Sequence, residues 1–279
     1  MDEDIIKINK IGGMTNINYF CETSVRQCVV RIPGDNTEVM INREYEKFNC
    51  QLATELQLNP ELYHYDLESG IKITAYINQS LTLTPQSVTE KNTLKMIAST
   101  LKKLHSSNLK FANHFNVFEQ YRNYIKTLVK SDISYNKFEK TEEFFYALEE
   151  ILRYKSNVLV ACHNDPVPEN FLLKNSNIYL IDWEYSGMND PIWDISAFFE
   201  ESNLSDEYER YFLELYYEKE VSNEILEKIL IYKICQNFLW SVWTLIKEKN
   251  EKLFGDYGNI RYQKCLKQIE LYKERHYEK

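Results

Sequence analysis

One short segment carries polar side chains at a spacing that suits phosphate chemistry. The segment His163-Asn164-Asp165 is followed by Asn170, and Asp182 comes twelve residues after that. Four residues separate Asp165 from Asn170, which is the H-x-D-x-x-x-x-N spacing of a phosphoryl-transfer loop. Such chemistry needs a base that orients the attacking hydroxyl, and oxygen ligands that hold Mg²⁺ on the phosphates. The pattern predicts Asp165 as the base and Asn170 and Asp182 as magnesium ligands.

The neighbouring segments support this interpretation over a simple turn. An Asp in a turn often only closes an Asx-turn, so a lone H-x-D motif would carry little weight. Here the run Asn157–Ala161, which is apolar from Val158 onward, is typical of a buried strand and precedes the motif. The segments Phe171–Leu173 and Ile178–Ile181 flank a turn-rich loop and predict a hairpin. A strand, a tight loop and a hairpin end would bring the three polar side chains together.

Candidate nucleotide-binding residues lie upstream. The loop Ile11–Asn16 contains a glycine pair, and its backbone N–H groups could cover phosphates, which suggests Gly13, Thr15 and Asn16. Arg31 ends a predicted strand and could pair with phosphate, while Glu44 on the next helix could pair with Arg31. Each feature alone is more typical of an ordinary turn or a solvated charge. Their order relative to Asp165 is what supports the assignment.

The elements that must position these residues change in character along the chain. Two strands, Asn18–Glu22 and Cys28–Ile32, form a predicted hairpin, and Ile71–Ile77 is a further strand. Helical stripes recur elsewhere, at Ile41, Tyr45, Phe48 and Leu52, at Leu94, Ile97, Leu101 and Leu104, along Phe115–Arg153, and after Pro191. The pattern predicts an α+β chain with two lobes, and together with the H-x-D-x-x-x-x-N spacing it indicates a two-lobed protein-kinase-like fold. A small β-rich N-lobe would span residues 1–78 and a large, mostly helical C-lobe residues 79–279.

Composition excludes several classes of protein. The formal net charge is −9 and no basic face is visible, so a nucleic-acid partner is not expected. The six cysteines show no C-x-x-C spacing, which indicates reduced thiols and no zinc site. The N-terminus has no apolar signal region, and the longest apolar stretch, Phe238–Ile246, is too short to span a bilayer. We expect a cytoplasmic protein without a membrane partner, of unknown oligomeric state.

With these residues in place, the chain resembles the choline/ethanolamine kinase family, in the aminoglycoside-phosphotransferase-like branch of the kinase fold. The resemblance covers Gly12 to about Arg261 and includes GGMTNINY, VVRIPG, NREYE, ITAYI, HNDPVPENFL, LIDWEYSGMNDPIWDISAFFEE and NFLWSVWTLIKE. Protein kinases have Arg and Gly at the positions of Asn164 and Glu184, and they also carry an A-P-E element that is absent here. A protein substrate is therefore not expected.

The resemblance implies a substrate pocket. Trp240 and Trp243 lie three residues apart, hence on one helix face, and spacing alone suits core residues as well as a cation–π cage. The family match favours the cage, with Tyr185 and Tyr257 as further walls and Glu201 as a counter-charge. It also implies that Asp194 supports the catalytic loop. His105 matches the end of a family helix, which implies a capping or packing role and not a catalytic one. The implied reaction is magnesium-assisted transfer from ATP to choline, giving phosphocholine.

Two alternatives remain at this point. One is a kinase for another small alcohol or amine, such as ethanolamine, thiamine or an aminoglycoside. The other is a ligand-binding member of the fold without catalysis, against which the retained Asp165, Asn170 and Asp182 argue. The sequence does not choose between ATP and GTP.

Overall fold

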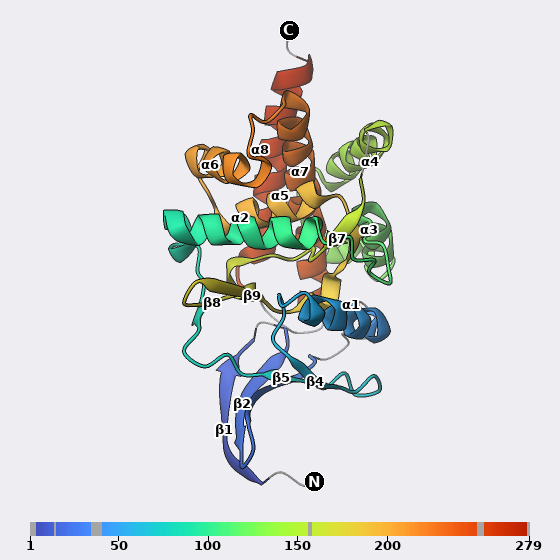
Figure 1. The fold of residues 1–279 in the computed structure, drawn as a ribbon. Coiled ribbons are helices and arrows are strands. Elements are labelled where there is room, and N and C mark those ends of the chain that lie inside the picture. Colours follow the sequence, from blue (N-terminus) through green and yellow to red (C-terminus); the bar gives the residue numbers. More distant parts are fainter. Residues whose placement is uncertain (1–3, 14, 35–40, 156–157, 250–253, 278–279) are drawn as a thin grey trace.

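The computed structural model describes residues 4–13, 15–34, 41–155, 158–249 and 254–277. A five-stranded antiparallel sheet forms one end of the molecule and a helical body forms the other (Figure 1). The strands are β1 (Ile5–Gly12), β2 (Ile17–Thr23), β3 (Gln27–Ile32), β4 (Leu62–Tyr65), β5 (Lys72–Ala75), β6 (Leu81–Thr82), β7 (Val160–Cys162), β8 (Phe171–Lys174), β9 (Asn177–Leu180) and β10 (Gly187–Asn189).

The α-helices lie mostly in the second part of the chain, and short 3₁₀ turns occur between them and the strands. The helices are α1 (Arg43–Glu55), α2 (Lys91–His105), α3 (Val117–Ile125), α4 (Phe138–Tyr154), α5 (Pro191–Ser202), α6 (Asp206–Tyr217), α7 (Asn223–Lys249) and α8 (Tyr257–Tyr277). The 3₁₀ turns are η2 (Ser87–Thr89), η3 (Lys130–Asp132), η4 (Pro168–Asn170) and η5 (Trp183–Tyr185). The predicted α+β, kinase-like architecture is confirmed.

The N-terminal sheet has the order β1-β2-β3-β5-β4. The predicted hairpin is confirmed, because β2 and β3 pair in register from Ile17 opposite Ile32. The turn between them is closed by Thr23, whose hydroxyl oxygen accepts hydrogen bonds from the backbone N–H groups of Val25 and Arg26. The hairpin places Arg31 at the end of β3, beside the helical body.

The edge strand β1 was not predicted. All eight of its residues are exposed, so its isoleucines do not alternate between a buried and a solvent face. Its register with β2 is also irregular, between Ile5 and Lys7 and again between Lys10 and Gly12. A strand without a buried face lacks the period-two signal on which strand prediction depends.

Helix α1 is present, but the predicted apolar stripe does not face the core. Tyr45 and Phe48 are exposed, whereas Glu46 and Asn49 are buried. Asn49 donates hydrogen bonds to Asn113 and to Ser186, so the inward face of the helix carries polar residues beside the buried Cys50 and Ala53. The stripe prediction was wrong at Tyr45 and Phe48, whereas Ile41 is buried and Leu52 packs against the core. Buried hydrogen bonds and apolar burial together orient this helix.

The first helix of the body is confirmed, since Leu94, Ile97, Leu101 and Leu104 of α2 are all fully buried. The predicted helical stretch Phe115–Arg153 is instead interrupted between α3 and α4. The helices expected after Pro191 are confirmed as α5 to α8.

The strand before the catalytic motif begins later than predicted. It spans Val160–Cys162, and Val158 and Leu159 before it are exposed, so the run is not wholly buried. The remaining residue of the predicted strand, Asn157, lies outside the described residues. The hairpin after the motif is confirmed as β8 and β9, paired from Phe171 opposite Leu180.

The two lobes use different sheets. The last strand of the five-stranded sheet in sequence, β5, ends at Ala75, whereas β6 pairs with β8 of the body. Sheet partners therefore change between these strands. The boundary at residues 78 and 79 stays a prediction.

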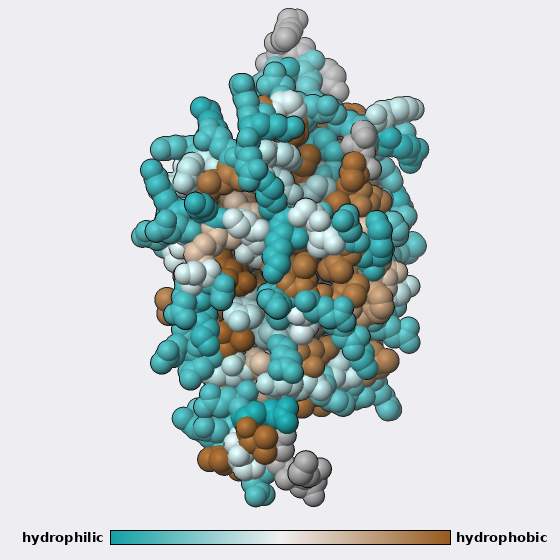
Figure 2. Space-filling view, in the orientation of Figure 1, coloured by the Kyte–Doolittle hydropathy of each residue, from teal (hydrophilic) through white to brown (hydrophobic). Residues whose placement is uncertain are grey.

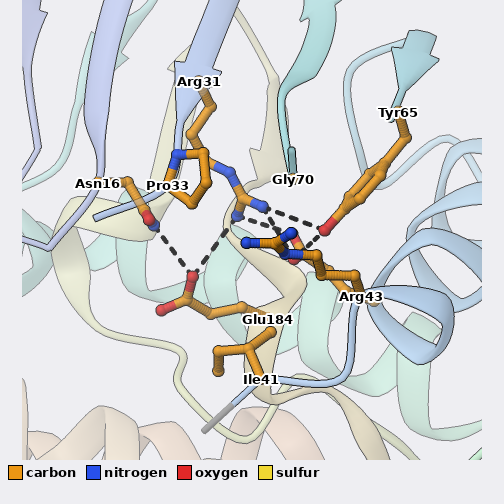
Figure 3. Close-up of a pocket in the computed structure, with 9 residues that line it drawn as sticks. Asn16, Arg31, Pro33, Ile41, Arg43, Tyr65, Gly70 and Glu184 are labelled. Carbon is orange, nitrogen blue, oxygen red and sulfur yellow. Dashed lines mark hydrogen bonds and ion pairs between the residues drawn. The ribbon is translucent and has the colours of Figure 1, made fainter. Parts of the chain in front are cut away.

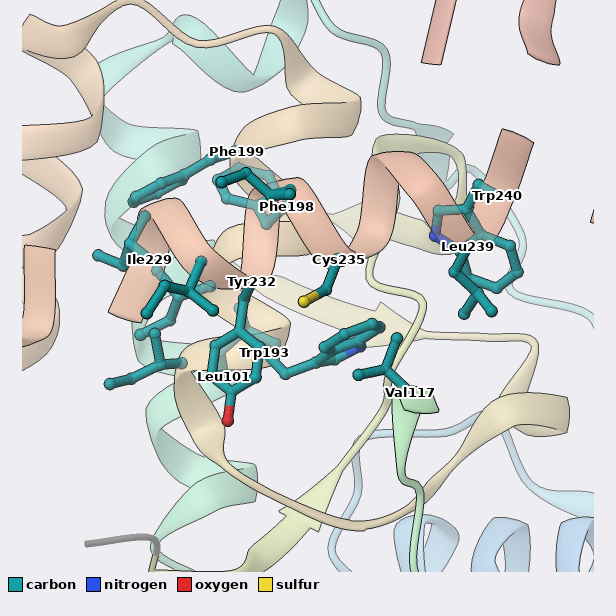
Figure 4. Packing of buried hydrophobic residues seen from close by; sticks show 14 of the residues in the cluster. Leu101, Val117, Trp193, Phe198, Phe199, Ile229, Tyr232, Cys235, Leu239 and Trp240 are labelled. Carbon is teal, nitrogen blue, oxygen red and sulfur yellow. The ribbon is translucent and has the colours of Figure 1, made fainter. Parts of the chain in front are cut away.

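Helix α7 runs through the middle of the body. It is long and apolar enough to cross a membrane by composition, but 94% of the relevant window is buried inside the protein. Figure 4 shows Tyr232, Cys235 and Leu239 of this helix beside Trp193 and Phe198 of α5. Figure 2 shows polar side chains over most of the visible surface, with apolar residues gathered near the middle. These features are those of a core helix.

Candidate active site

A single cavity of about 700 Å³ lies where the N-terminal sheet meets the helical body. It is lined by twelve of the fourteen residues that the sequence analysis assigned to catalysis, metal, nucleotide, substrate or support of the loop, His105 not counted. These are Gly13, Thr15, Asn16, Arg31, Asp165, Asn170, Asp182, Tyr185, Glu201, Trp240, Trp243 and Tyr257. The two exceptions are Glu44, which is exposed near the start of α1, and Asp194, which is buried beneath the catalytic loop.

The loop that carries Asp165 is closed by its own side chains. The Asn170 amide nitrogen donates to the backbone carbonyl of Asp165 over 2.9 Å. The His163 ring accepts from the Asp165 N–H through Nδ1 and donates through Nε2 to the Ile181 carbonyl, at 3.3 and 2.8 Å. Burial lowers the pKa of His163, which favours this neutral form. The loop is thereby tied to the segment that carries Asp182.

Asp194 lies beneath this loop rather than in the cavity. One carboxylate oxygen accepts from the His163 N–H at 2.8 Å and the other accepts from the Asn164 N–H at 2.7 Å. Asn164 has a left-handed φ of +68°, so the loop turns sharply just before Asp165. Since the carboxylate is fully buried, its two bonds fix the backbone of the two residues that precede Asp165.

His105 also lies under the loop. Its Nε2 is 3.0 Å from the Asp194 carboxylate and its Nδ1 is 2.7 Å from the Tyr216 hydroxyl. The side chain ends α2 and is buried, and it does not line the cavity. It therefore extends the support of the loop to α6.

The charges around Asp165 are mostly negative. Burial, together with Glu201, Asp182 and Glu184, raises the pKa of Asp165 well above its usual range, while Arg261 opposes the rise. Burial and the neighbouring Asp182 also raise the pKa of Glu184 to about 7. A cluster of carboxylates in a cleft favours cationic ligands.

Behind this cluster lies a buried ion-pair network (Figure 3). The Arg31 guanidinium contacts both carboxylate oxygens of Glu46, at 2.7 and 2.8 Å, and also the Asp182 carboxylate at 3.0 Å. Lys72 and the Tyr65 hydroxyl donate to the same Glu46, at 2.8 and 2.6 Å. Burial alone would raise the pKa of Glu46, but Lys72 and Arg31 lower it strongly.

The predicted pairing of Arg31 with Glu44 was therefore wrong. Glu44 is exposed near the start of α1, and the partner is Glu46, two residues later. Residues two apart on a helix do not share a face, and only Glu46 lies on the inward one. Sequence reasoning missed Glu46, Lys72 and Tyr65, because no periodic signal marks a buried charge.

The glycine loop is tight. Gly13 has a φ of +122°, and a Cβ atom there would lie 1.9 Å from the Asn16 carbonyl oxygen, so only glycine fits. The Asn16 amide donates to Glu184 over 3.0 Å and accepts from the Gly34 N–H over 3.3 Å. These two hydrogen bonds anchor the glycine loop to Glu184 and to the backbone after β3.

The opposite end of the cavity is aromatic. Trp240 and Trp243 come from α7, Tyr185 from η5 and Tyr257 from the start of α8. The Tyr185 and Trp240 rings meet edge to face with centroids 5.3 Å apart, and the two indoles meet in the same way at 6.2 Å. Both indoles are over nine-tenths buried and still line the cavity, so they are core residues and wall residues at once.

A carboxylate lies among these rings. Glu201, at the end of α5, accepts from the Tyr257 hydroxyl at 3.2 Å and from the Arg261 guanidinium at 2.6 Å. Arg261 is buried and was not predicted as a site residue.

Comparison with known proteins agrees with this geometry. The family model described as choline/ethanolamine kinase matches residues 8–217. The protein LicA of Haemophilus influenzae is 38% identical over 266 residues, which cover 92% of this chain and 99% of that protein.

Solved structures give the same result. The choline kinase LicA from Streptococcus pneumoniae superposes with a TM-score of 0.88 at 39% identity, covering 96% of this chain and 95% of that one. A LicA structure in complex with AMP gives 0.87 at 38% identity, covering 97% and 93%. An ADP-bound aminoglycoside phosphotransferase, APH(2'')-Ib, shares the fold alone, with a TM-score of 0.65 at 16% identity over 97% of this chain and 94% of that one.

Proposed function

This chain belongs to the choline/ethanolamine kinase family, and we propose that it transfers the γ-phosphoryl group of ATP to the hydroxyl of choline. One observation carries the proposal. A single cavity has carboxylates on a catalytic loop at one end and four aromatic rings with a carboxylate at the other. The first end suits phosphoryl transfer and the second suits a small onium ion.

Asp165 is the base in this proposal. Its carboxylate orients the choline hydroxyl and takes the proton as the oxygen attacks phosphorus. The raised pKa of the buried group supports the role, because a base is most effective when its pKa approaches the working pH. The rigid loop supports it too, because phosphoryl transfer depends on position more than on covalent chemistry by the protein.

Asn170 and Asp182 would hold Mg²⁺. The Asn170 nitrogen is already bonded to the Asp165 carbonyl, so its side-chain oxygen is the atom left for a cation. Asp182 is partly exposed to the cavity, with 29% of its side chain accessible. An amide oxygen and a carboxylate are the hard ligands that Mg²⁺ prefers. When bound, the ion would neutralise charge on the phosphates.

The nucleotide would lie against the N-terminal sheet. Gly13, Thr15 and Asn16 offer a tight loop for the phosphates, and Arg31 lies 3.0 Å from Asp182. Lys72 also lines the cavity and adds a second cation there. Glu46 holds the side chains of Arg31 and Lys72 in place, which supports a nucleoside triphosphate as the phosphoryl donor.

Choline would lie against the rings of Trp240, Trp243, Tyr185 and Tyr257. A quaternary ammonium has no N–H donor, so aromatic faces hold it better than hydrogen-bond acceptors do. The six cysteines are buried thiols, which fits work in the reducing cytosol.

The test is ATP consumption with choline, ethanolamine, thiamine and an aminoglycoside as acceptors, with Asp165→Ala as the blank. We expect magnesium-dependent consumption to be fastest with choline and absent in the variant. Consumption with thiamine or the aminoglycoside but not with choline would overturn the substrate. No acceptor-dependent consumption at all would favour the binding protein without catalysis.

A further inference from the structure

The carboxylate in the aromatic end of the cavity is already paired within the protein. The Oε1 atom of Glu201 accepts from Arg261 Nη1 at 2.6 Å and from the Tyr257 hydroxyl at 3.2 Å. The Arg261 side chain is 3% accessible and that of Glu201 is 18% accessible, so the pair lies at the back of the cavity. A ligand there meets a carboxylate whose negative charge is balanced by the Arg261 guanidinium.

Arg261 has little else to bind. Its Nε and Nη2 atoms are buried without a hydrogen-bond partner in the part of the chain that the structure describes. Its guanidinium carbon lies 5.8 Å from the centre of the Tyr257 ring, a contact through charge and packing. Burial opposes the charge, but Glu201 raises the pKa of Arg261, so the group stays charged. Its hydrogen bonding is therefore directed at Glu201.

Two small alcohols would experience this arrangement differently. Ethanolamine carries an ammonium with three N–H donors, and a buried donor without an acceptor costs free energy. Choline carries methyl groups in place of these donors and needs no acceptor. Both protein donors bind Oε1 of Glu201, so a third donor would meet Oε2 of a carboxylate whose negative charge is shared with Arg261, which makes it a weaker acceptor.

We propose that Arg261 is a specificity-determining positioning residue, which occupies Glu201 and thereby makes the pocket select quaternary over primary ammonium alcohols. The inference rests on the proposed function and deepens it. Arg261 acts through Glu201 and does not itself line the cavity. Selection arises partly by weakening the acceptor that Glu201 offers to an ammonium donor, in addition to the aromatic attraction for the right substrate.

The test is the ratio of kcat/KM for ethanolamine to that for choline. Arg261→Met keeps an unbranched apolar side chain beside Tyr257 and releases Glu201. We expect the ratio to rise about tenfold, the size of one charge-assisted hydrogen bond gained by ethanolamine. Arg261→Lys keeps a charged donor and should leave the ratio close to that of the wild type.

A second variant covers the case in which Arg261→Met does not fold. Tyr257→Phe keeps the ring and removes the other donor to Glu201, so the ratio should shift in the same direction by a smaller factor. In a Glu201→Gln background, Arg261→Met should no longer change the ratio, because Arg261 acts through that carboxylate. Melting temperatures of each variant report folding separately.

The outcomes separate the two proposals. If the wild type does not phosphorylate choline, the proposed function fails, whatever happens with ethanolamine. If it phosphorylates choline but the ratio stays unchanged in both Arg261→Met and Tyr257→Phe, Arg261 is a structural ion pair and this inference is overturned. A shift that persists in the Glu201→Gln background would also overturn it.

Discussion

The two ends of the cavity are built by different means. At the catalytic end, hydrogen bonds to a fully buried carboxylate, Asp194, fix the backbone of His163 and Asn164, the two residues before Asp165. At the aromatic end, rings on α7, α8 and η5 form the wall and are positioned mainly by packing against one another. Charge-assisted hydrogen bonds contribute about 1.5–3 kcal/mol each, whereas an aromatic pair contributes about 0.5–1.5 kcal/mol.

The difference separates two tasks. Directional bonds hold one group in one place, which transfer of a phosphoryl group requires. Aromatic faces present a broad attractive surface, which suits a cation without donors. Damage at the catalytic end should therefore lower kcat, and damage at the aromatic end should raise KM for the alcohol.

The largest expected effect is at Asp165. Asp165→Ala should leave folding and ATP binding nearly intact and lower kcat by about 10²–10⁴-fold, the usual contribution of a positioned base. Steady-state kinetics with choline and a thermal melt measure both quantities. Turnover close to that of the wild type would remove Asp165 from the role of base.

The next effect tests the network behind the catalytic end. Glu46→Gln should destabilise the protein by about 3–5 kcal/mol, because Arg31 and Lys72 would keep buried charges without their shared partner. Glu44→Gln, two residues earlier and exposed, is the matched control and should stay within about 0.5 kcal/mol of the wild type. Urea unfolding of the two variants gives the comparison. Equal stabilities would mean that the network contributes nothing net to the fold.

The smallest expected effect is at the aromatic end. Trp240→Ala and Trp243→Ala should each raise KM for choline about tenfold or more, since each ring contributes roughly 1–2 kcal/mol to cation binding. Phe at either position should cost less, because a smaller π-face remains. A wild-type KM combined with a lower melting temperature would identify the rings as core residues only.

What could be predicted from the sequence was local or periodic. Asp165, Asn170 and Asp182 lie within a short segment, so their spacing is visible directly, and α2 shows a clean apolar stripe. The aromatic wall needed the family resemblance, because Trp240 and Trp243 have the spacing of core residues and are indeed buried.

The rest depends on contacts between distant segments. Lys72 and Glu46 meet across the N-lobe, and Arg261 meets Glu201 from sixty positions away. A buried charge is stable only with its partner, and neither residue of such a pair marks the other in the sequence. For the same reason the sequence did not reveal that Glu46 and Asn49 lie on the inward face of α1.

The central claim is that alcohol binding and transfer belong to different ends of one cavity. The most direct test is the dissociation constant of choline, measured by titration calorimetry with the ADP complex of Asp165→Ala and of Trp240→Ala. The account predicts near wild-type choline affinity in Asp165→Ala and about tenfold weaker affinity in Trp240→Ala. Equal losses of choline affinity in the two variants would contradict the separation of the two ends.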